Sequence, residues 1–94
     1  MFCSLSIYAQ TSTEFFDKGL EQIYDQKYND AIMNFDKCID MDKDNEVAYY
    51  NRGLCKYYLK DYKAAIKDYE KAIKIKKDYP NAYINMGLAY ENSE

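Results

Sequence analysis

The chain contains only three glycines, Gly19, Gly53 and Gly87, and the interval from the first to the second equals the interval from the second to the third. The residues around them recur with the same period, because AYYNRGL (48–54) returns as AYINMGL (82–88), and a weaker copy, EFFDKGL (14–20), precedes both. A fixed period of about 20 to 50 residues is typical of repeat proteins, in which each unit packs against the next. We therefore divide most of the chain into two complete units and a partial third: 12–45, 46–79 and 80–94.

Large and small apolar residues recur within the units at spacings of three, four and seven, which is the spacing of one helix face. One proline and three glycines leave little material for the turns of a sheet. We therefore expect an all-α chain with two helices in each complete unit. The residues expected to pack within and between the units are Phe15, Gly19, Ala31, Phe35, Cys38, Tyr49, Gly53, Tyr62, Ala65, Tyr69, Ala72, Tyr83 and Gly87.

The starts of the first helices are predicted from local signals. Thr11 and Glu14 have the spacing of a capping box, which places the first helix after Thr11. Asp44 or Asn45 can cap the equivalent helix of the second unit, and Pro80 suits the first turn of the third.

The two helices of each complete unit are expected to be separated near residues 26–27 and 60–61, where the apolar phase resets, and Asp61 can cap the helix that follows. A glycine inside a helix costs about 1 kcal/mol relative to alanine. Some gain in packing must offset this cost at three positions. We expect the glycine at position 8 of each unit to face the alanine at position 20, where two helices cross closely.

This register resembles the tetratricopeptide repeat, which has aromatic residues at positions 4, 17 and 24, glycine at 8, and alanine at 20 and 27. The unit 46–79 meets nearly all of the pattern, whereas the unit 12–45 has Cys38 in place of alanine. Both complete units lack the family's proline at position 32, where Lys43 and Lys77 stand. The resemblance covers about nine-tenths of the chain and implies a right-handed superhelical array of antiparallel helix pairs, an α-solenoid of about two and a half repeats.

In proteins of this family the first helices of the repeats line a concave groove that binds a peptide or a partner helix. Carried over by position, the resemblance implies a groove formed by Phe16, Asp17, Leu20, Tyr50, Asn51, Leu54, Tyr57, Ile84, Asn85 and Leu88. Flanking groove positions are Thr13, Ile23, Tyr24, Val47, Tyr58 and Asn81. The alternative is that these residues only pack neighbouring helices of a short array. The groove reading makes the chain a protein-interaction module or scaffold.

Some family members clamp the acidic C-terminal tail of chaperones with lysines and asparagines at fixed groove positions. Those positions hold Phe16, Leu20, Asn51, Asn81 and Asn85 here, and only Asn51 matches. We therefore expect a protein or peptide partner that is not held by such a clamp. Because the third unit lacks a second helix, the chain is also interpreted as a piece of a longer array that self-associates, as a homo-oligomer, through its last helix.

The sequence contains few residues in arrangements that are suited to enzymatic catalysis. There is no histidine, no glycine-rich phosphate loop, and no serine or cysteine with a base at motif spacing. Cys3, Cys38 and Cys55 form neither a zinc motif nor a paired disulfide framework. We expect no enzyme activity, no small-molecule substrate, no metal and no cofactor.

Charge is distributed unevenly along the chain. The unit 12–45 has nine acids and four bases, whereas the unit 46–79 has five acids and nine bases. Five lysines of that unit, four of them on one helix face, form the lysine stripe: Lys60, Lys63, Lys67, Lys71 and Lys74. A basic convex face of this kind is an alternative site for nucleic acid or an anionic membrane, although such runs are commonly just solvated.

Residues 1–11 differ from the rest because they lack charge and are largely apolar or small. They are interpreted as either a disordered tail or the remnant of a signal peptide cleaved near Ala9, although no basic residue precedes that point. A signal remnant would predict an exported or periplasmic protein, and a tail would predict a cytoplasmic one, so the compartment stays open.

Overall fold

The computed structural model describes the backbone of residues 3–93, with side chains from residue 12 onward. The chain forms five helices and, between residues 3 and 93, no strand, which confirms the expected all-α helical repeat array. The helices are α1 (Cys3–Tyr24), α2 (Tyr28–Met41), α3 (Glu46–Tyr58), α4 (Tyr62–Ile75) and α5 (Pro80–Asn92).

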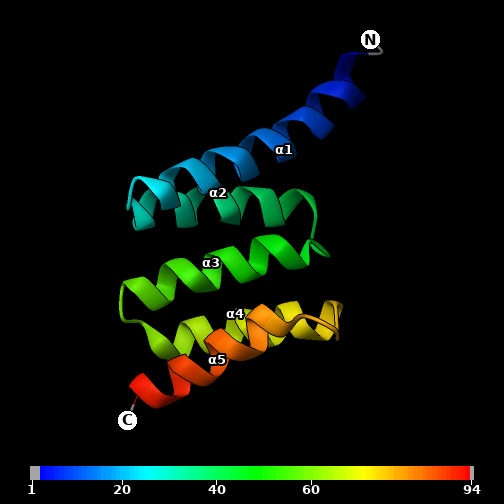
Figure 1. Ribbon diagram of the computed structural model, residues 1–94. Coiled ribbons are helices and arrows are strands. Elements are labelled where there is room, and N and C mark those ends of the chain that lie inside the picture. The colour runs from blue at the N-terminus through cyan, green and yellow to red at the C-terminus, as the bar shows by residue number, and fades with distance from the viewer. Residues whose placement is uncertain (1–2, 94) are drawn as a thin grey trace.

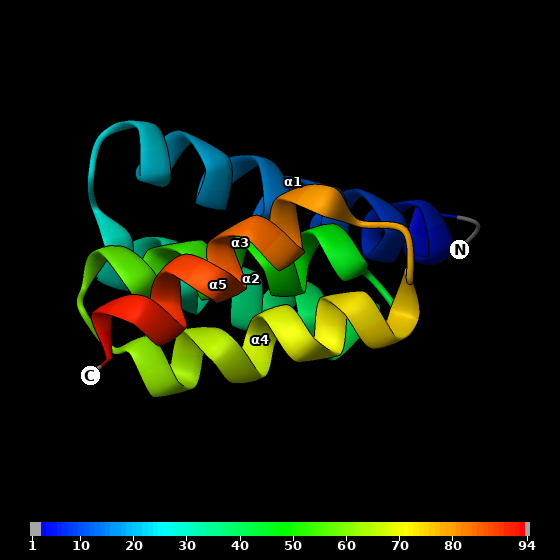
Figure 2. The same cartoon turned by 60° about the horizontal axis from the view of Figure 1, so that its bottom comes forward.

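The helices follow one another along the molecule, so that the two ends of the chain lie at opposite ends of the array (Figure 1). Each helix packs mainly against its neighbours in sequence, and α3 also contacts α1 and α5. The fold is therefore elongated and thin, with principal extents of 53 × 29 × 16 Å. The first helix of each unit is α1, α3 or α5. In the turned view, α4 runs below α5, on the side of the array away from α1 (Figure 2).

Three of the expected helix starts are observed. The Asn45 side chain accepts a hydrogen bond from the Ala48 amide at 3.0 Å, and Asp61 accepts one from the Ala64 amide at 3.4 Å. Pro80 is the first residue of α5, where its missing N–H costs no helical hydrogen bond. These caps satisfy amides that the first helical turn leaves without backbone partners.

The start of α1 differs from expectation. The helix begins at Cys3 and runs through Thr11, so the Thr11–Glu14 capping box does not mark a helix start. The sequence before Thr11 contains neither proline nor glycine, and nothing in it terminates a helix. Residues 3–11, interpreted from the sequence as part of a disordered tail or a signal remnant, are therefore the first turns of α1. The signal-remnant interpretation concerns processing, and its first two residues lie outside the described part, so it stays a prediction.

The breaks expected near residues 26–27 and 60–61 are turns of one type. Gln26 and Lys60 have positive φ angles of 62° and 68° and occupy the same position of the two complete units. The Lys27 amide bonds to the Gln22 carbonyl at 2.7 Å, and the Asp61 amide bonds to the Lys56 carbonyl at 2.8 Å. This pattern is that of a Schellman motif, which reverses the chain at the end of a helix. Glycine is the usual residue at the position with positive φ. Because Gln26 and Lys60 stand there instead, the sequence did not predict this turn type.

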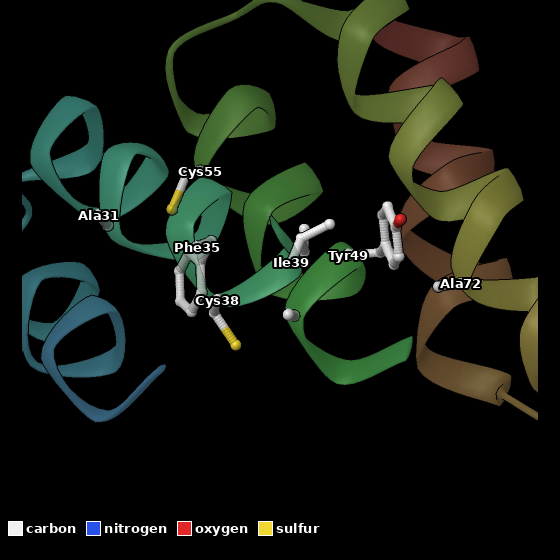
Figure 3. Packing of buried hydrophobic residues seen from close by; sticks show 8 residues of the cluster. Ala31, Phe35, Cys38, Ile39, Tyr49, Cys55 and Ala72 are labelled. Carbon is white, nitrogen blue, oxygen red and sulfur yellow. The ribbon is translucent and has the colours of Figure 1, made fainter. Parts of the chain in front are cut away.

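The core consists of the small and aromatic residues that recur with the repeat. Phe35, Cys38, Cys55 and Tyr69 are the largest side chains that are fully buried. Phe35 and Cys38 from α2 lie near Cys55 from α3, and Ala72 from α4 lies beyond Tyr49 (Figure 3). Alanines fill the remaining space between helices and allow close approach. The core therefore consists of two clusters that follow each other along the array, one formed mainly by α2 and α3 and one by α4 and α5, and Tyr50 packs against both.

The glycines of the two complete units sit against aromatic rings. A Cβ atom at Gly19 would lie 2.7 Å from the Phe35 ring, and one at Gly53 would lie 2.9 Å from the Tyr69 ring. The glycine at position 8 therefore faces the aromatic residue at position 24, and not the alanine at position 20 as expected. A ring lying over the glycine backbone needs the space that a Cβ atom would occupy.

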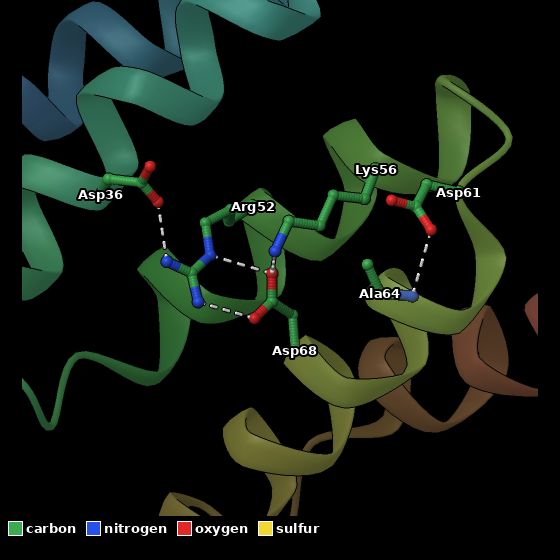
Figure 4. Close-up of polar contacts among 6 residues, drawn as sticks. All are labelled: Asp36, Arg52, Lys56, Asp61, Ala64 and Asp68. Carbon is green, nitrogen blue, oxygen red and sulfur yellow. Dashed lines mark hydrogen bonds and ion pairs between the residues drawn. The ribbon is translucent and has the colours of Figure 1, made fainter.

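A network of charged side chains crosses three helices. Arg52 on α3 donates two hydrogen bonds to the Asp68 carboxylate on α4, at 2.9 and 2.8 Å, and one to Asp36 on α2 at 2.7 Å (Figure 4). Lys56 Nζ lies 3.0 Å from the same Asp68 carboxylate. Asp68 is buried, which the charge pattern of the sequence does not predict for a carboxylate. The network joins the two complete repeats.

The glycine contacts predict opposite effects of the same substitution at two equivalent positions. Gly53→Ala should lower the free energy of unfolding by about 1–3 kcal/mol, because its Cβ would collide with the Tyr69 ring. Gly87→Ala should raise it by about 1 kcal/mol, since nothing lies within 4 Å and alanine favours the helix. Urea denaturation followed by circular dichroism measures both. Equal effects of the two changes would contradict the glycine–ring contact.

The charged network predicts that its two aspartates contribute unequally to the stability of the fold. Asp68→Ala should lower the free energy of unfolding by about 3–5 kcal/mol, because Arg52 and Lys56 would lose their buried partner. Asp36→Ala removes an ion pair to the same arginine, but Asp36 is exposed, and the loss should stay below about 1 kcal/mol. The same denaturation experiment compares the two variants. A cost at Asp68 no larger than that at Asp36 would show that the network contributes little.

Candidate functional site

The predicted groove residues all lie on α1, α3 and α5, and we call their surface the first-helix face. Leu20, Leu54 and Leu88 occupy the same position of successive repeats. Leu20 and Leu88 are 39% and 41% exposed, Ile84 is 61% exposed, and Leu54 is half-buried. Aliphatic side chains on three successive first helices, exposed on α1 and α5 and half-buried on α3, therefore form an apolar row that is partly accessible to water.

Two other predicted groove residues lie between helices. Tyr50 on α3 is half-buried, and its hydroxyl accepts a hydrogen bond from Asn85 of α5 at 2.6 Å. Tyr57, further along the same helix, accepts one from Asn92 at 3.0 Å. These tyrosines hold α5 against α3, which is the packing role that the sequence left as the alternative. Their rings still border the first-helix face.

The asparagines at position 6 of the second and third units have different surroundings. Asn85 donates to Tyr50, the residue at position 5 of the preceding unit. Asn51 has Phe16 at the equivalent place, and phenylalanine carries no hydroxyl. Asn51 instead donates to the Val47 carbonyl of its own helix at 2.9 Å. Its amide oxygen makes no hydrogen bond among residues 12–93 and can accept one from a backbone N–H.

The remaining predicted residues of this face lie on α1. Phe16 is half-buried and packs edge-on against the Phe35 ring, with a centroid distance of 5.9 Å. Asp17 is exposed and lines an open hollow of about 550 Å³. Other residues around the hollow are Leu20, Glu21, Tyr24 and Asp25. Glu21 and Asp25 were missed by position-by-position comparison with the family, because they lie one place beyond the expected groove positions.

The packing residues of the partial third unit are not buried. Tyr83 is 49% exposed, and a Cβ atom at Gly87 would meet nothing within 4 Å. The other predicted packing residues are all buried or half-buried. Positions 4 and 8 pack on the second helix of the same unit, and no such helix lies against α5 within residues 3–93.

Burial changes the acidity of several core groups. Desolvation raises the pKa of the Cys55 thiol to about 12 and that of the Tyr79 hydroxyl to about 12. It also raises the pKa of the Tyr69 hydroxyl, which has no hydrogen-bond partner among residues 3–93. Hydrogen bonds to Asp68 raise the pKa of Arg52 further above its usual value. The buried Cys55 thiol therefore stays protonated at neutral pH and is not a reactive thiolate.

Four residues of the lysine stripe lie on α4, and Lys60 lies in the turn before that helix. All five of its lysines are exposed, and Lys71 is the one whose ammonium lies near an aromatic ring, 5.8 Å from the Tyr49 ring centroid. Within the described helices, none is long and apolar enough to cross a membrane. No group of three metal-ligating side chains occurs among the residues that the structure describes.

Comparison with known proteins gives one family match and several similar structures. Residues 55–93 match the family model described as TPR repeat. The first TPR of Spaghetti (RPAP3), solved with the HSP90 peptide SRMEEVD, is 28% identical with a TM-score of 0.86, and the match covers 90% of this chain and 68% of that one. The MamA protein is 29% identical (TM-score 0.85; 87% and 45% covered). The Arabidopsis OM64 TPR domain is 26% identical (TM-score 0.86; 89% and 69% covered).

The chain corresponds to only part of each of these structures. The chain spans about two-thirds of the first and third structures and less than half of MamA. No curated protein sequence matches it significantly.

The raised pKa values predict a loss of stability in alkali. The folded state holds the Cys55 and Tyr79 protons up to about pH 12, whereas the unfolded chain releases them near pH 9 and 10. Stability from these groups is therefore complete below about pH 9 and declines as pH rises towards 12. Between its unfolded-state pKa, about 9 for Cys55 and about 10 for Tyr79, and pH 12, each group should lower the free energy of unfolding by roughly 1 kcal/mol per pH unit. Urea denaturation at pH 7, 9 and 10.5 measures the decline, and Cys55→Ala should flatten its first part. A level profile in the unmodified chain would contradict the burial of these groups.

Proposed function

Because this chain belongs to the tetratricopeptide-repeat family, we propose that it is a protein-interaction module that holds a peptide or a helix of a partner protein against its first-helix face. The observation that carries the proposal is the apolar row of Leu20, Leu54, Ile84 and Leu88, which remains accessible on three successive first helices. Burying such side chains contributes about 25 cal/mol per Å² of apolar area removed from water. The row therefore supplies a driving force for docking a segment.

Polar contacts on the same face give the docked segment a direction and a register. The Asn51 amide oxygen is available to accept a backbone N–H, whereas the Asn85 amide is already used by Tyr50. Asn51 thus lies beside the apolar row with a free acceptor, and Leu54 lies one turn further along α3. We place the centre of the binding surface on α3, between these two residues.

The proposal does not extend to the acidic-tail clamp of some relatives. The first TPR of Spaghetti was solved with an acidic HSP90 peptide, but here the clamp positions hold Phe16, Leu20, Asn51, Asn81 and Asn85, which include no lysine or arginine. An acidic terminus would meet Asp17 and no base at these positions. We therefore propose a partner segment that is recognised mainly through apolar side chains.

The proposal predicts which substitutions release a native partner. Leu54→Glu places a charge in the apolar row and should abolish capture of partner proteins from an extract of the host. Asn51→Ala should weaken capture by about 2–10-fold, the equivalent of one hydrogen bond. Both variants should retain the helical circular dichroism spectrum of the unmodified chain.

The matched control changes the opposite face. Lys67→Glu with Lys71→Glu reverses two charges of the lysine stripe and should leave the captured proteins unchanged at low and moderate salt. Partners lost only with this variant would refute docking on the first-helix face. They would instead support a salt-dependent contact between the stripe and nucleic acid or an anionic surface.

A further inference from the structure

We propose that the segment bound by the first-helix face carries basic side chains at the end that lies on α1, an inference that rests on the proposed function. The occupant to which we commit is a cationic amphipathic segment of a partner protein. Its apolar side chains would cover the row from Leu20 to Leu88, and its basic residues would enter the hollow on α1.

The first observation is the composition of that hollow. It is open, has a volume of about 550 Å³, and is lined by two apolar and three acidic residues: Leu20, Tyr24, Asp17, Glu21 and Asp25. Tyr24 is 90% exposed, so an aromatic surface lies beside the carboxylates without a covering residue. Lysine and arginine side chains match this arrangement, because their alkyl stems pack on apolar surface while their charged ends reach carboxylates. Arginine also stacks on exposed aromatic rings.

The second observation is that these acids make no ion pair within the described side chains. No lysine or arginine nitrogen lies within 4 Å of the Asp17, Glu21 or Asp25 carboxylates among residues 3–93. The nearby Lys18 is exposed and does not line the hollow. On α3, Arg52 and Lys56 are already paired with aspartates. A basic partner side chain would therefore find three carboxylates that make no ion pair within the described side chains.

The third observation is the position of the acids along α1. Asp17 and Glu21 lie on α1 and Asp25 directly follows its last residue, at successive intervals of four positions, so like charges lie near one another and repel. The last turn of α1 contains no base, and a helix C-terminus adds about half a negative elementary charge. All these charges act at the end of the first-helix face that α1 forms. A cationic side chain would relieve the repulsion, and this end would fix the direction of the bound segment.

The test uses a display library of short random peptides, selected against the full chain at low salt. The unmodified chain should enrich peptides with apolar residues and should enrich lysine and arginine at least about twofold over the input library. The variant Asp17→Asn, Glu21→Gln, Asp25→Asn should still enrich apolar residues but no longer basic ones. A synthetic peptide from the first selection should bind this variant about 10-fold more weakly in fluorescence anisotropy. That difference should shrink at high salt, which screens exposed charges.

Two controls make the outcomes distinguishable. The variant Asp40→Asn, Glu70→Gln, Asp78→Asn removes the same number of exposed acids outside α1 and should keep the basic preference. Leu54→Glu should enrich no peptide family. Enrichment of apolar peptides without basic residues, or of acidic peptides, would overturn the inference while leaving the proposed function in place. A basic preference that survives in the α1 variant would also overturn it. Failure of the unmodified chain to enrich any family beyond Leu54→Glu would overturn both.

Discussion

The contact between a glycine and an aromatic ring determines how the helices of each repeat cross. Gly19 meets the Phe35 ring and Gly53 meets the Tyr69 ring, and the interval along the sequence is the same in both pairs. This interval sets the register of the two antiparallel helices, and the neighbouring positions obey it too, because Arg52 pairs with Asp68 across the same offset. The cost of glycine in a helix is thus offset by ring packing that no side chain with a Cβ atom would allow.

The sequence predicts this architecture well where local signals and periodicity agree. The breaks between helices, the caps at Asn45 and Asp61, and the role of Pro80 follow from short-range chemistry, and the structure contains them. The burial of Asp68 could not be read in this way, because periodicity separates polar from apolar residues but does not pair charges across helices. Had the offset between glycine and ring been known, it would have predicted that Arg52 lies opposite Asp68, since residues 52 and 68 adjoin residues 53 and 69.

Equivalent positions of a repeat have the same burial and the same contacts only when their neighbours are also equivalent. Gly87 and Tyr83 match the buried glycines and aromatics of the first two units, yet they are exposed because no second helix lies against them within residues 3–93. Asn51 and Asn85 match each other, but only Asn85 finds a hydroxyl, since Phe16 takes the place of tyrosine one unit earlier. Repeat register therefore predicts which face a residue occupies, whereas its contacts depend on the adjacent unit.

This dependence separates the first-helix face into two parts. Towards α5, the polar groups of this face already form the Tyr50–Asn85 and Tyr57–Asn92 hydrogen bonds between α3 and α5. Few of their donors and acceptors remain for a partner. Towards α1 the carboxylates are unpaired among the described residues, while the arginine and lysine on α3 are held by Asp68. Internal pairing thus removes positive charge from the middle of the array and leaves negative charge at one end. A segment that docks along the apolar row would meet these unequal ends, so its two possible directions would differ in energy.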